Sequence, residues 1–299
     1  MRALKVFLFA AIFLGAAAFY LFHVTVPDVS ILKTHYPAVR YLSKEKAAEV
    51  TLQPARPKSW VSIKSVSKGV LGAIIVSEDW AFFQHDGYDA NQLQLVLQEV
   101  WEKKKLGRGA STITQQVVKN VFLSNERSVV RKVLEFYLSI QLDEILNKYR
   151  ILEIYINIAE MGPGIYGIGP ASYYYFKKGP GELNAKEGAF LAMLLPSPVR
   201  YGQSFRERKL SYFARHSIES ILDKMVRANY LTESERYELR SYNLSFEQMP
   251  EAVAEPAADA DEEFIESEEK SGETNPGVDS PRESEDAADS PPPPAASEP

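Results

Sequence analysis

The 299-residue chain contains no cysteine and only four histidines. Disulfides are therefore excluded, and the fold must be stabilised by its core alone. There is no histidine cluster, and Asp-x-Asp occurs only near the C-terminus, in Asp259-Ala260-Asp261, so nothing in the sequence demands a metal. No convincing alternation of apolar and polar residues reaches strand length, and helical periodicity dominates instead. These absences predict a mainly α-helical protein.

One long uncharged apolar run is present, Val6–Phe22, and it follows Arg2 and Lys5. At about 1.5 Å per residue, with a few flanking residues, it approaches the roughly 30 Å hydrocarbon core of a bilayer. We expect a stub over 1–5, a single-pass transmembrane anchor over 6–26, a cytoplasmic N-terminus and an exported body. A cleaved signal peptide is the alternative, because Gly15–Ala18 offers small residues, although the apolar run continues past them.

The C-terminal end is strongly acidic. Residues 250–299 hold 16 acidic residues, two basic residues and nine prolines, which leaves 32 basic and 24 acidic residues for 1–249. Such a segment has too little apolar area to offset its chain entropy, so we expect a disordered tail over 244–299. It is either a solubilising spacer or, alternatively, an interaction arm or a segment that shields the basic body of the same chain. The basic body suits an anionic membrane surface or a phosphate-bearing substrate.

Between these ends the sequence predicts a stalk over 27–58, with a short helix near Tyr41–Val50, and one globular domain over 59–243. A glycine-rich loop follows Glu160. The expected helices are Ser65–Asp79, Asn91–Leu106, Ser111–Leu123, Ser128–Asn147, Tyr149–Glu160, Ala185–Leu195, Ser204–Asn229 and Thr232–Ser241.

Two carboxylates, Glu78 and Asp79, stand beside Trp80, Phe82 and Phe83. Burial among aromatic side chains raises the pKa of a carboxyl group and so makes it a better proton acceptor.

About twenty residues further on, a glycine-led turn enters a polar helix start at Gly109–Gln116. Free backbone N–H groups at a helix start can hold an anion. A carboxylate base and an anion site on one chain suggest displacement of a phosphorylated leaving group.

The helix start and the later segment around Glu135 can each also be explained by structure alone. Thr112–Gln115 matches a capping box, so it could serve only to start a helix. Against that, Gln115, Gln116 and Lys119 share a helical face. Glu135 lies at the edge of an apolar stripe, where a carboxylate needs a partner such as Arg131, Lys119 or Arg127.

Taken in order, these motifs resemble glycosyltransferase family 51, the peptidoglycan glycosyltransferases of bacterial cell-wall synthesis. The resemblance covers roughly Lys58 to Tyr201. It is carried by Glu78-Asp79-x-x-Phe82-x-x-His85-x-Gly87, Gly109-x-Ser111-Thr112-x-Thr114-Gln115-Gln116-x-x-Lys119-Asn120, Arg131-Lys132-x-x-Glu135, Lys148–Asn157, Gly162–Ile168, Glu187-x-Ala189-x-Leu191-Ala192 and Pro196-Ser197-Pro198.

Asn157–Gly164 is similar to the monofunctional biosynthetic branch, and the short remainder after Arg200 leaves no room for a transpeptidase domain. The resemblance implies a lysozyme-like helical domain on the outer face of the cytoplasmic (inner) membrane. There it would polymerise lipid II into β-1,4-linked glycan with inversion and release of undecaprenyl pyrophosphate.

By motif position Glu78 would be the general base, Asp79 would orient it, and Glu135 would be the second essential carboxylate. The residues implied to hold the pyrophosphate and sugars are Lys119, Arg127, Ser111, Gln115, Gln116, Gly109, Thr112 and Arg131. Fixed cations aimed at the leaving pyrophosphate lower the barrier. No cofactor is certain, and Mg²⁺ or Mn²⁺ beside Glu135 is left open.

The partners implied are lipid II, the nascent lipid-linked glycan and the membrane, with cell-wall division or elongation proteins and penicillin-binding transpeptidases as candidates and no nucleic acid. Two alternatives remain. A lytic transglycosylase or lysozyme-like enzyme would cleave glycan and would not need cations that converge on a pyrophosphate. A non-catalytic cell-wall scaffold would not need Glu78.

Overall fold

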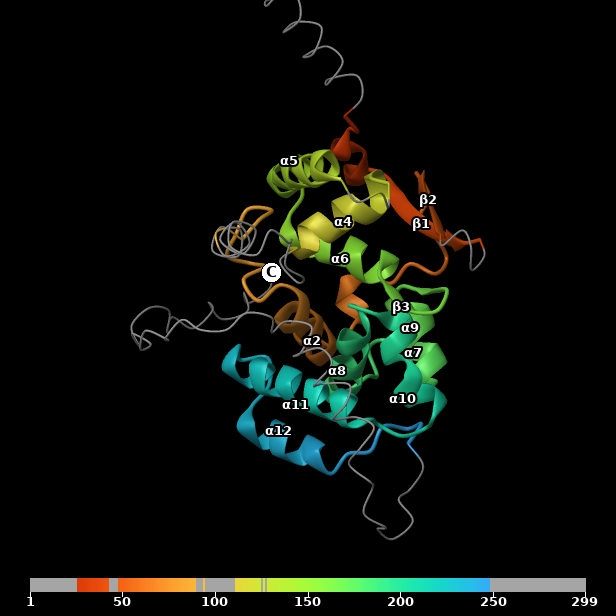
Figure 1. Ribbon diagram of the computed structural model, residues 1–299, viewed down its shortest axis with the longest axis vertical. Coiled ribbons are helices and arrows are strands. Elements are labelled where there is room, and N and C mark those ends of the chain that lie inside the picture. The colour runs from red at the N-terminus through yellow and green to blue at the C-terminus, as the bar shows by residue number, and fades with distance from the viewer. Residues whose placement is uncertain are drawn as a thin grey trace, which may run out of the picture. The chain divides into compact units, whose positions relative to one another are not determined.

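The protein is described here from a computed structural model and is mainly α-helical, as the sequence predicts (Figure 1). The structure describes residues 26–42, 48–89, 94, 111–124, 126 and 128–247. They fall into two compact units, each treated below by itself. The first takes the described residues within 1–40, 49–57 and 83–154, and the second takes the others. The boundary after Ile154 falls inside α6 (Lys148–Ile158).

Several predicted features lie outside the described residues. They are the stub, the anchor except for its last residue, nearly all of the helix expected over Asn91–Leu106, and nearly all of the acidic tail. Within the part of the chain that is described, no helix combines the length and apolar character that crossing a bilayer requires.

In the first unit, α4 (Ile113–Phe122) packs on α5 (Val129–Ile145), and α5 packs on the short 3₁₀ helix η1 (Val29–Lys33). Both α4 and α5 match helices expected from the sequence. Their fully buried apolar residues recur at helical spacing and include Ile113, Val117, Val118, Leu138 and Leu142.

The short helix expected near Tyr41–Val50 is wrong. The chain instead forms a two-stranded sheet from β1 (Tyr36–Tyr41) and β2 (Ala48–Gln53). Across the sheet the Arg40 guanidinium lies 2.9 Å from the Glu49 carboxylate. The exposure of β2 alternates over its first four residues only, and this period of two is too short to outweigh the local helix formers.

The core of the second unit is built on α8 (Ala185–Leu194), in which every residue is buried. It packs against α2 (Lys68–Glu78) and α11 (Tyr212–Arg227). A Cβ atom placed on Gly188 would lie 2.7 Å from the Cα atom of Val70. The closeness of α2 and α8 therefore depends on glycine at that position.

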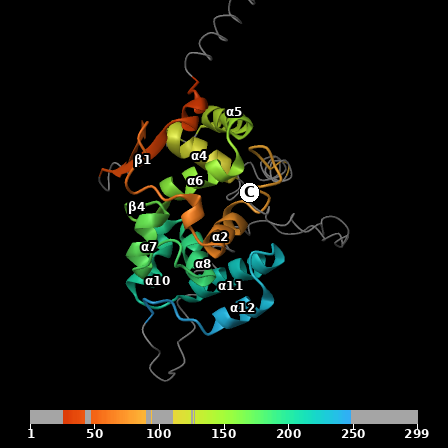
Figure 2. The ribbon, with the colours of Figure 1, turned by 180° about the vertical axis from the view of Figure 1, so that it is seen from behind.

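The remaining elements of this unit surround that core (Figure 2). The antiparallel pair β3 (Glu160–Gly162) and β4 (Ile165–Tyr166) leads into α7 (Ile168–Phe176), a helix that the sequence analysis did not predict. The other elements are η2 (Ile63–Ser65), α9 (Pro198–Tyr201), α10 (Gln203–Arg206) and α12 (Glu233–Arg240).

The single helix expected over Ser204–Asn229 is two helices. The chain turns between α10 and α11, where Arg208 adopts a left-handed conformation with φ of 55°. Ser211 then starts α11, because its side chain accepts a hydrogen bond from the Ala214 N–H group at 3.1 Å. This N-cap is the start signal that the periodicity alone did not reveal.

Candidate active site

Glu78 is the last residue of α2, and Asp79 caps that helix. The Asp79 N–H group donates to the Ile75 carbonyl at 2.9 Å, and only 2% of the Asp79 residue is exposed. No basic residue lies in the last turn of α2. The two adjacent carboxylates therefore lie at the C-terminal end of a helix, where the helix dipole is negative.

Tyr155, on α6 in the same unit, contacts this pair. Its hydroxyl donates to Oε2 of Glu78 across a long 3.4 Å hydrogen bond, and 1% of the residue is exposed. Burial raises the pKa of Tyr155 well above its usual value, and the charge of Glu78, their hydrogen bond and the charge of Asp79 raise it further. The tyrosine therefore stays protonated, and the carboxylate is the acceptor.

The aromatic residues that follow the carboxylates divide into two kinds. Phe82 is fully buried, whereas Trp80 and Phe83 are 41% and 40% exposed. Phe82 therefore belongs to the core beside this turn, whereas Trp80 and Phe83 reach the surface. The Phe82 N–H group donates to the Asp79 carbonyl at 3.0 Å, which closes a turn after α2 and directs Phe82 inward.

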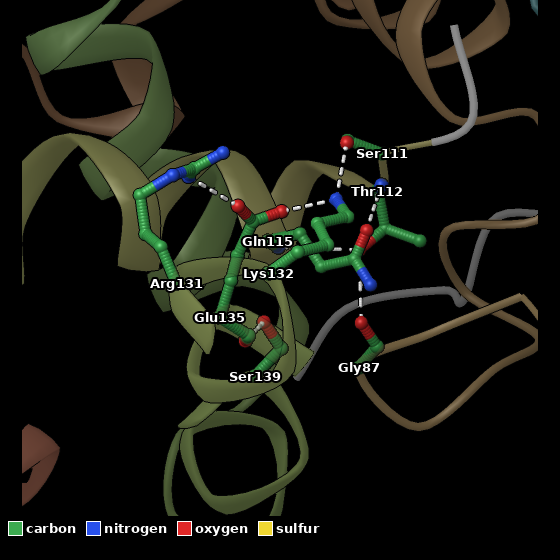
Figure 3. A network of polar contacts seen from close by, with 8 residues as sticks. All are labelled: Gly87, Ser111, Thr112, Gln115, Arg131, Lys132, Glu135 and Ser139. Carbon is green, nitrogen blue, oxygen red and sulfur yellow. Dashed lines mark hydrogen bonds and ion pairs between the residues drawn. The ribbon is translucent and has the colours of Figure 1, made fainter. Parts of the chain in front are cut away.

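In the first unit, α4 starts with the capping box that the sequence predicted, which is confirmed. Oγ1 of Thr112 accepts from the Gln115 N–H group at 3.2 Å, and Oε1 of Gln115 accepts from the Thr112 N–H group at 3.1 Å. The Thr112 hydroxyl also donates to the Gly87 carbonyl at 2.8 Å (Figure 3). Gln115 is 5% exposed. The structure thus places Thr112 and Gln115 in the framework of the helix start.

Gly87 fits this place for a steric reason. Its φ is 85°, and a Cβ atom would lie 2.5 Å from the Ser139 carbonyl oxygen. Only glycine can bring the backbone this close to α5 while its own carbonyl accepts from Thr112. The segment after the carboxylate pair is thereby fixed to both α4 and α5.

Glu135, on α5, is the centre of a charged cluster (Figure 3). Its side chain is 2% exposed. Oε2 lies 2.8 Å from Nη1 of Arg131, and Oε1 contacts Nζ of Lys132. Lys132 also donates to Oγ of Ser111 at 2.9 Å, and so connects α5 to the chain just before α4. The predicted partner Arg131 is confirmed, while Lys132 was not foreseen in this role.

The cluster holds two cations for one carboxylate. The carboxylate lies between two hydrogen-bonding cations, and the positive charge in excess can attract an anion. Two further predicted site residues, Gln116 and Lys119, are half-buried on α4.

A divalent metal does not fit Glu135. Both oxygens of its carboxylate already contact cations, and a metal ion would have to displace Arg131 and Lys132. Within the described ranges, no group of three or more metal-binding side chains gathers elsewhere.

Comparison with known proteins decides the family. The transglycosylase family model matches residues 44–226, more than half of the chain. The chain belongs to the transglycosylase family. A biosynthetic peptidoglycan transglycosylase of Brucella suis biovar 1 is 40% identical over 190 residues, which are 64% of this chain and 84% of the relative. Another from Shewanella amazonensis is 42% identical over 160 residues, 52% of this chain and 65% of the relative.

Membership confirms the resemblance to glycosyltransferase family 51 and makes the protein a glycosyltransferase. The matched range contains the Glu78 pair, Tyr155 and the whole Glu135 cluster. Two predicted site residues of this transglycosylase, Gly109 and Arg127, lie outside the described residues.

One further carboxylate was missed. Asp143, on α5, has a side chain that is 3% exposed and pairs with Lys148 at 2.9 Å. The Thr114 hydroxyl of α4 donates to it at 3.3 Å. Lys148 opens a motif of the family resemblance, which was the available signal. The Thr114–Asp143 contact connects α4 to α5.

Tyr155 was also missed, although it belongs to the same motif. It shares a helical row with Ile151 and Ile158, so a purely apolar role was the natural interpretation. A tyrosine in such a row still needs a partner for its hydroxyl, and that need was the signal to follow.

Proposed function

We propose that this transglycosylase polymerises lipid II into β-1,4-linked peptidoglycan strands, with Glu78 as the general base. The observation that carries the proposal is the Glu78 carboxylate at the end of α2, with the protonated Tyr155 hydroxyl donating to it. The names of the curated relatives support peptidoglycan as the product class.

In the proposed step, the 4-hydroxyl oxygen of the acceptor GlcNAc bonds to the anomeric carbon of the donor MurNAc. The bond from that carbon to the phosphate oxygen breaks with its electron pair, and undecaprenyl pyrophosphate leaves. The hydroxyl proton passes to Glu78, and the anomeric centre inverts. The Tyr155 hydrogen bond orients the carboxylate, and the backbone of Asp79 caps α2 and closes the turn that follows Glu78.

The leaving pyrophosphate gains charge as the bond breaks, so fixed cations stabilise the transition state. We assign this to Arg131 and Lys132, which Glu135 holds in place, together with Lys119. Ser111 and Gln116 would contact the donor, whereas Thr112 and Gln115 shape the helix start. By motif position Arg127 and Gly109 belong to the same group. No step passes through a metal.

The same proposal includes a lysozyme-like glycosyltransferase domain over 59–243 that acts alone, without a transpeptidase partner domain. The run over 6–26 would anchor it in the cytoplasmic membrane with the domain on the outer face. There it would meet lipid II and the nascent glycan, together with other cell-wall proteins such as penicillin-binding transpeptidases.

The test is turnover of lipid II by the purified full chain, with glycan products resolved on a gel. Glu78→Gln keeps the shape and removes the base, and we expect the rate to fall about 10²- to 10⁴-fold. Glu233→Gln, an exposed carboxylate on α12, serves as the matched control and should keep full activity.

Each alternative predicts a different product. Shortening of added glycan, with no polymer formed, would identify a lytic enzyme. A folded wild type that forms no polymer, and a Glu78→Gln variant that still supports growth of a deletion strain, would identify a scaffold.

A further inference from the structure

The surface from α9 to the start of α11 carries concentrated positive charge. Residues 198–216 contain five arginines and lysines and a single acidic residue, Glu207. Arg206, Arg208, Lys209 and Arg215 are all exposed. Among the described residues, neither Arg208 nor Lys209 has a salt bridge. We call residues 198–216 the basic surface.

The basic surface is continuous and also has an apolar part. The Tyr201 and Phe213 rings lie 4.8 Å apart, which joins α9 to α11, and Nη1 of Arg206 donates to the Val199 carbonyl at 3.1 Å. Val199 is 61% exposed and Tyr212 is 57% exposed. Exposed apolar side chains bordered by cations are typical of a docking surface.

The chain leads into its acidic C-terminal segment next to this surface. After α12 it returns toward α10, as both views show (Figures 1 and 2). Phe246 is 8% exposed, and its ring lies 5.2 Å from the Phe205 ring of α10. It also packs on Phe190 of α8 at 5.0 Å. The described chain therefore ends at Glu247 beside the basic surface.

The sequence that follows complements this surface. Residues 250–299 hold 16 acidic residues against two basic ones. Their only aromatic residue, Phe264, stands with Ile265 in Glu262-Glu263-Phe264-Ile265-Glu266, an apolar pair flanked by carboxylates. The residues between Glu247 and Phe264 can span about 50 Å when extended, more than enough to reach any part of residues 198–216.

We propose that the acidic C-terminal segment docks in cis on the basic surface. Phe264 and Ile265 contact Val199 and Tyr212, and the flanking carboxylates pair with Arg208, Lys209 and Arg215. Tethering keeps the local concentration of the segment high, so weak contacts suffice. The docked segment excludes other polyanions and anionic lipid from the basic surface. This inference does not depend on the proposed reaction.

The test is zero-length carbodiimide coupling of the full chain, which joins a lysine amine to a carboxylate in contact, followed by peptide mapping. We expect Lys209 to couple to carboxylates of 250–299. Lys224, exposed near the other end of α11, is the matched control and should couple at least about fivefold less. Raising the salt from about 0.1 M to about 1 M, which cuts the screening length from about 10 Å to about 3 Å, should abolish the difference.

Two variants that keep Lys209 sharpen the test. Arg208→Asn with Arg215→Gln removes two charges, and asparagine tolerates the left-handed conformation at 208. Phe264→Ser removes the apolar contact. Each should lower the Lys209 coupling about fivefold. Equal coupling at Lys209 and Lys224 would overturn the proposal. Coupling at Lys209 that does not change with salt would also overturn it, as would coupling of the acidic segment to Lys132 instead of Lys209. The same holds if, in a mixed sample, the coupling joins isotopically distinct chains, because the docking would then not be in cis.

Discussion

At the scale of single residues, the position of one proton matters most. Burial keeps Tyr155 protonated, so its hydroxyl can only donate to Glu78 and cannot take the substrate proton in its place. This makes Tyr155 a positioning residue that favours the ionised, proton-accepting form of the carboxylate. The pairing was invisible to spacing because α2 and α6 are far apart in the sequence.

Tyr155→Phe should therefore lower the polymerisation rate about tenfold, since one hydrogen bond to a charged group is lost. The acid limb of the pH–rate profile should move to higher pH, because the ionised carboxylate loses a donor. The rate of lipid II turnover across pH, with thermal melting as a folding control, provides the measurement. A lower rate with an unmoved acid limb would show that the tyrosine is only structural.

The Glu135 cluster allows a matched pair of substitutions. Lys132 pairs with buried Glu135, and Lys178 pairs with buried Glu187; the lysine side chains are 36% and 33% exposed. Lys132→Met and Lys178→Met should both cost stability, because each removes a cation from a buried carboxylate. Only Lys132→Met should lower kcat/KM, by about 10- to 100-fold, because it removes a cation from the proposed pyrophosphate site.

Lipid II titrations of both variants separate the loss of kcat/KM from the loss of stability. Loss of activity in both variants, in parallel with their melting temperatures, would assign the effect to folding and contradict the pyrophosphate role.

At the scale of elements, two helices start with the same chemistry in different surroundings. Thr112 starts α4 and is 2% exposed, and Thr232 starts α12 and is exposed; both form capping boxes. Thr112→Ala should destabilise the protein by about 2 kcal/mol, because it removes the cap and also leaves the Gly87 carbonyl without its donor. Thr232→Ala should cost about 1 kcal/mol or less.

Urea unfolding of both variants, with Thr112→Ser as the conservative control, measures these costs. Equal costs at the two caps would contradict a special role for the link from Thr112 to Gly87.

Local signals explain which elements the sequence could predict. α4 and α5 have strong apolar periodicity and clear caps, and both were found. α7 was missed because it begins with Ile168-Gly169-Pro170 after a positive-φ glycine at Gly167, which is typical of a loop. The β1–β2 sheet was missed because its strands depend on pairing with each other, and neither is apolar enough to be noticed alone.

The residues of the candidate site also divide into those that the sequence could predict and those that it could not. Glu78, Glu135 and the capping box follow from motifs within single segments. Residues fixed by contacts between distant segments, such as Tyr155 with Glu78 or Lys132 with Ser111, required the structure.

At the scale of the whole molecule, raised tyrosine pKa values link stability to alkaline pH. Burial is the main cause for Tyr155, Tyr166 and Tyr175. It raises the pKa of Tyr166 to about 12, with the charge of Glu160 adding to the effect, and it also raises the pKa values of Tyr155 and Tyr175 above the usual value of 10.0. Between the unfolded and folded pKa values, the folded protein holds protons that the unfolded chain has released, so stability falls as pH rises through that range.

The contribution of these tyrosines to the thermal midpoint should therefore be constant below about pH 10, and the midpoint should fall steadily above it. Tyr175→Phe should make the fall shallower, because phenylalanine has no proton to lose. Tyr237→Phe, at a position 72% exposed, should leave the slope unchanged. Scanning calorimetry across pH, with tyrosinate absorbance recorded on the same samples, gives both quantities. If absorbance showed every tyrosine ionising near pH 10 while the protein stayed folded, burial would not be holding these hydroxyls protonated, and the positioning role of Tyr155 would lose its physical basis.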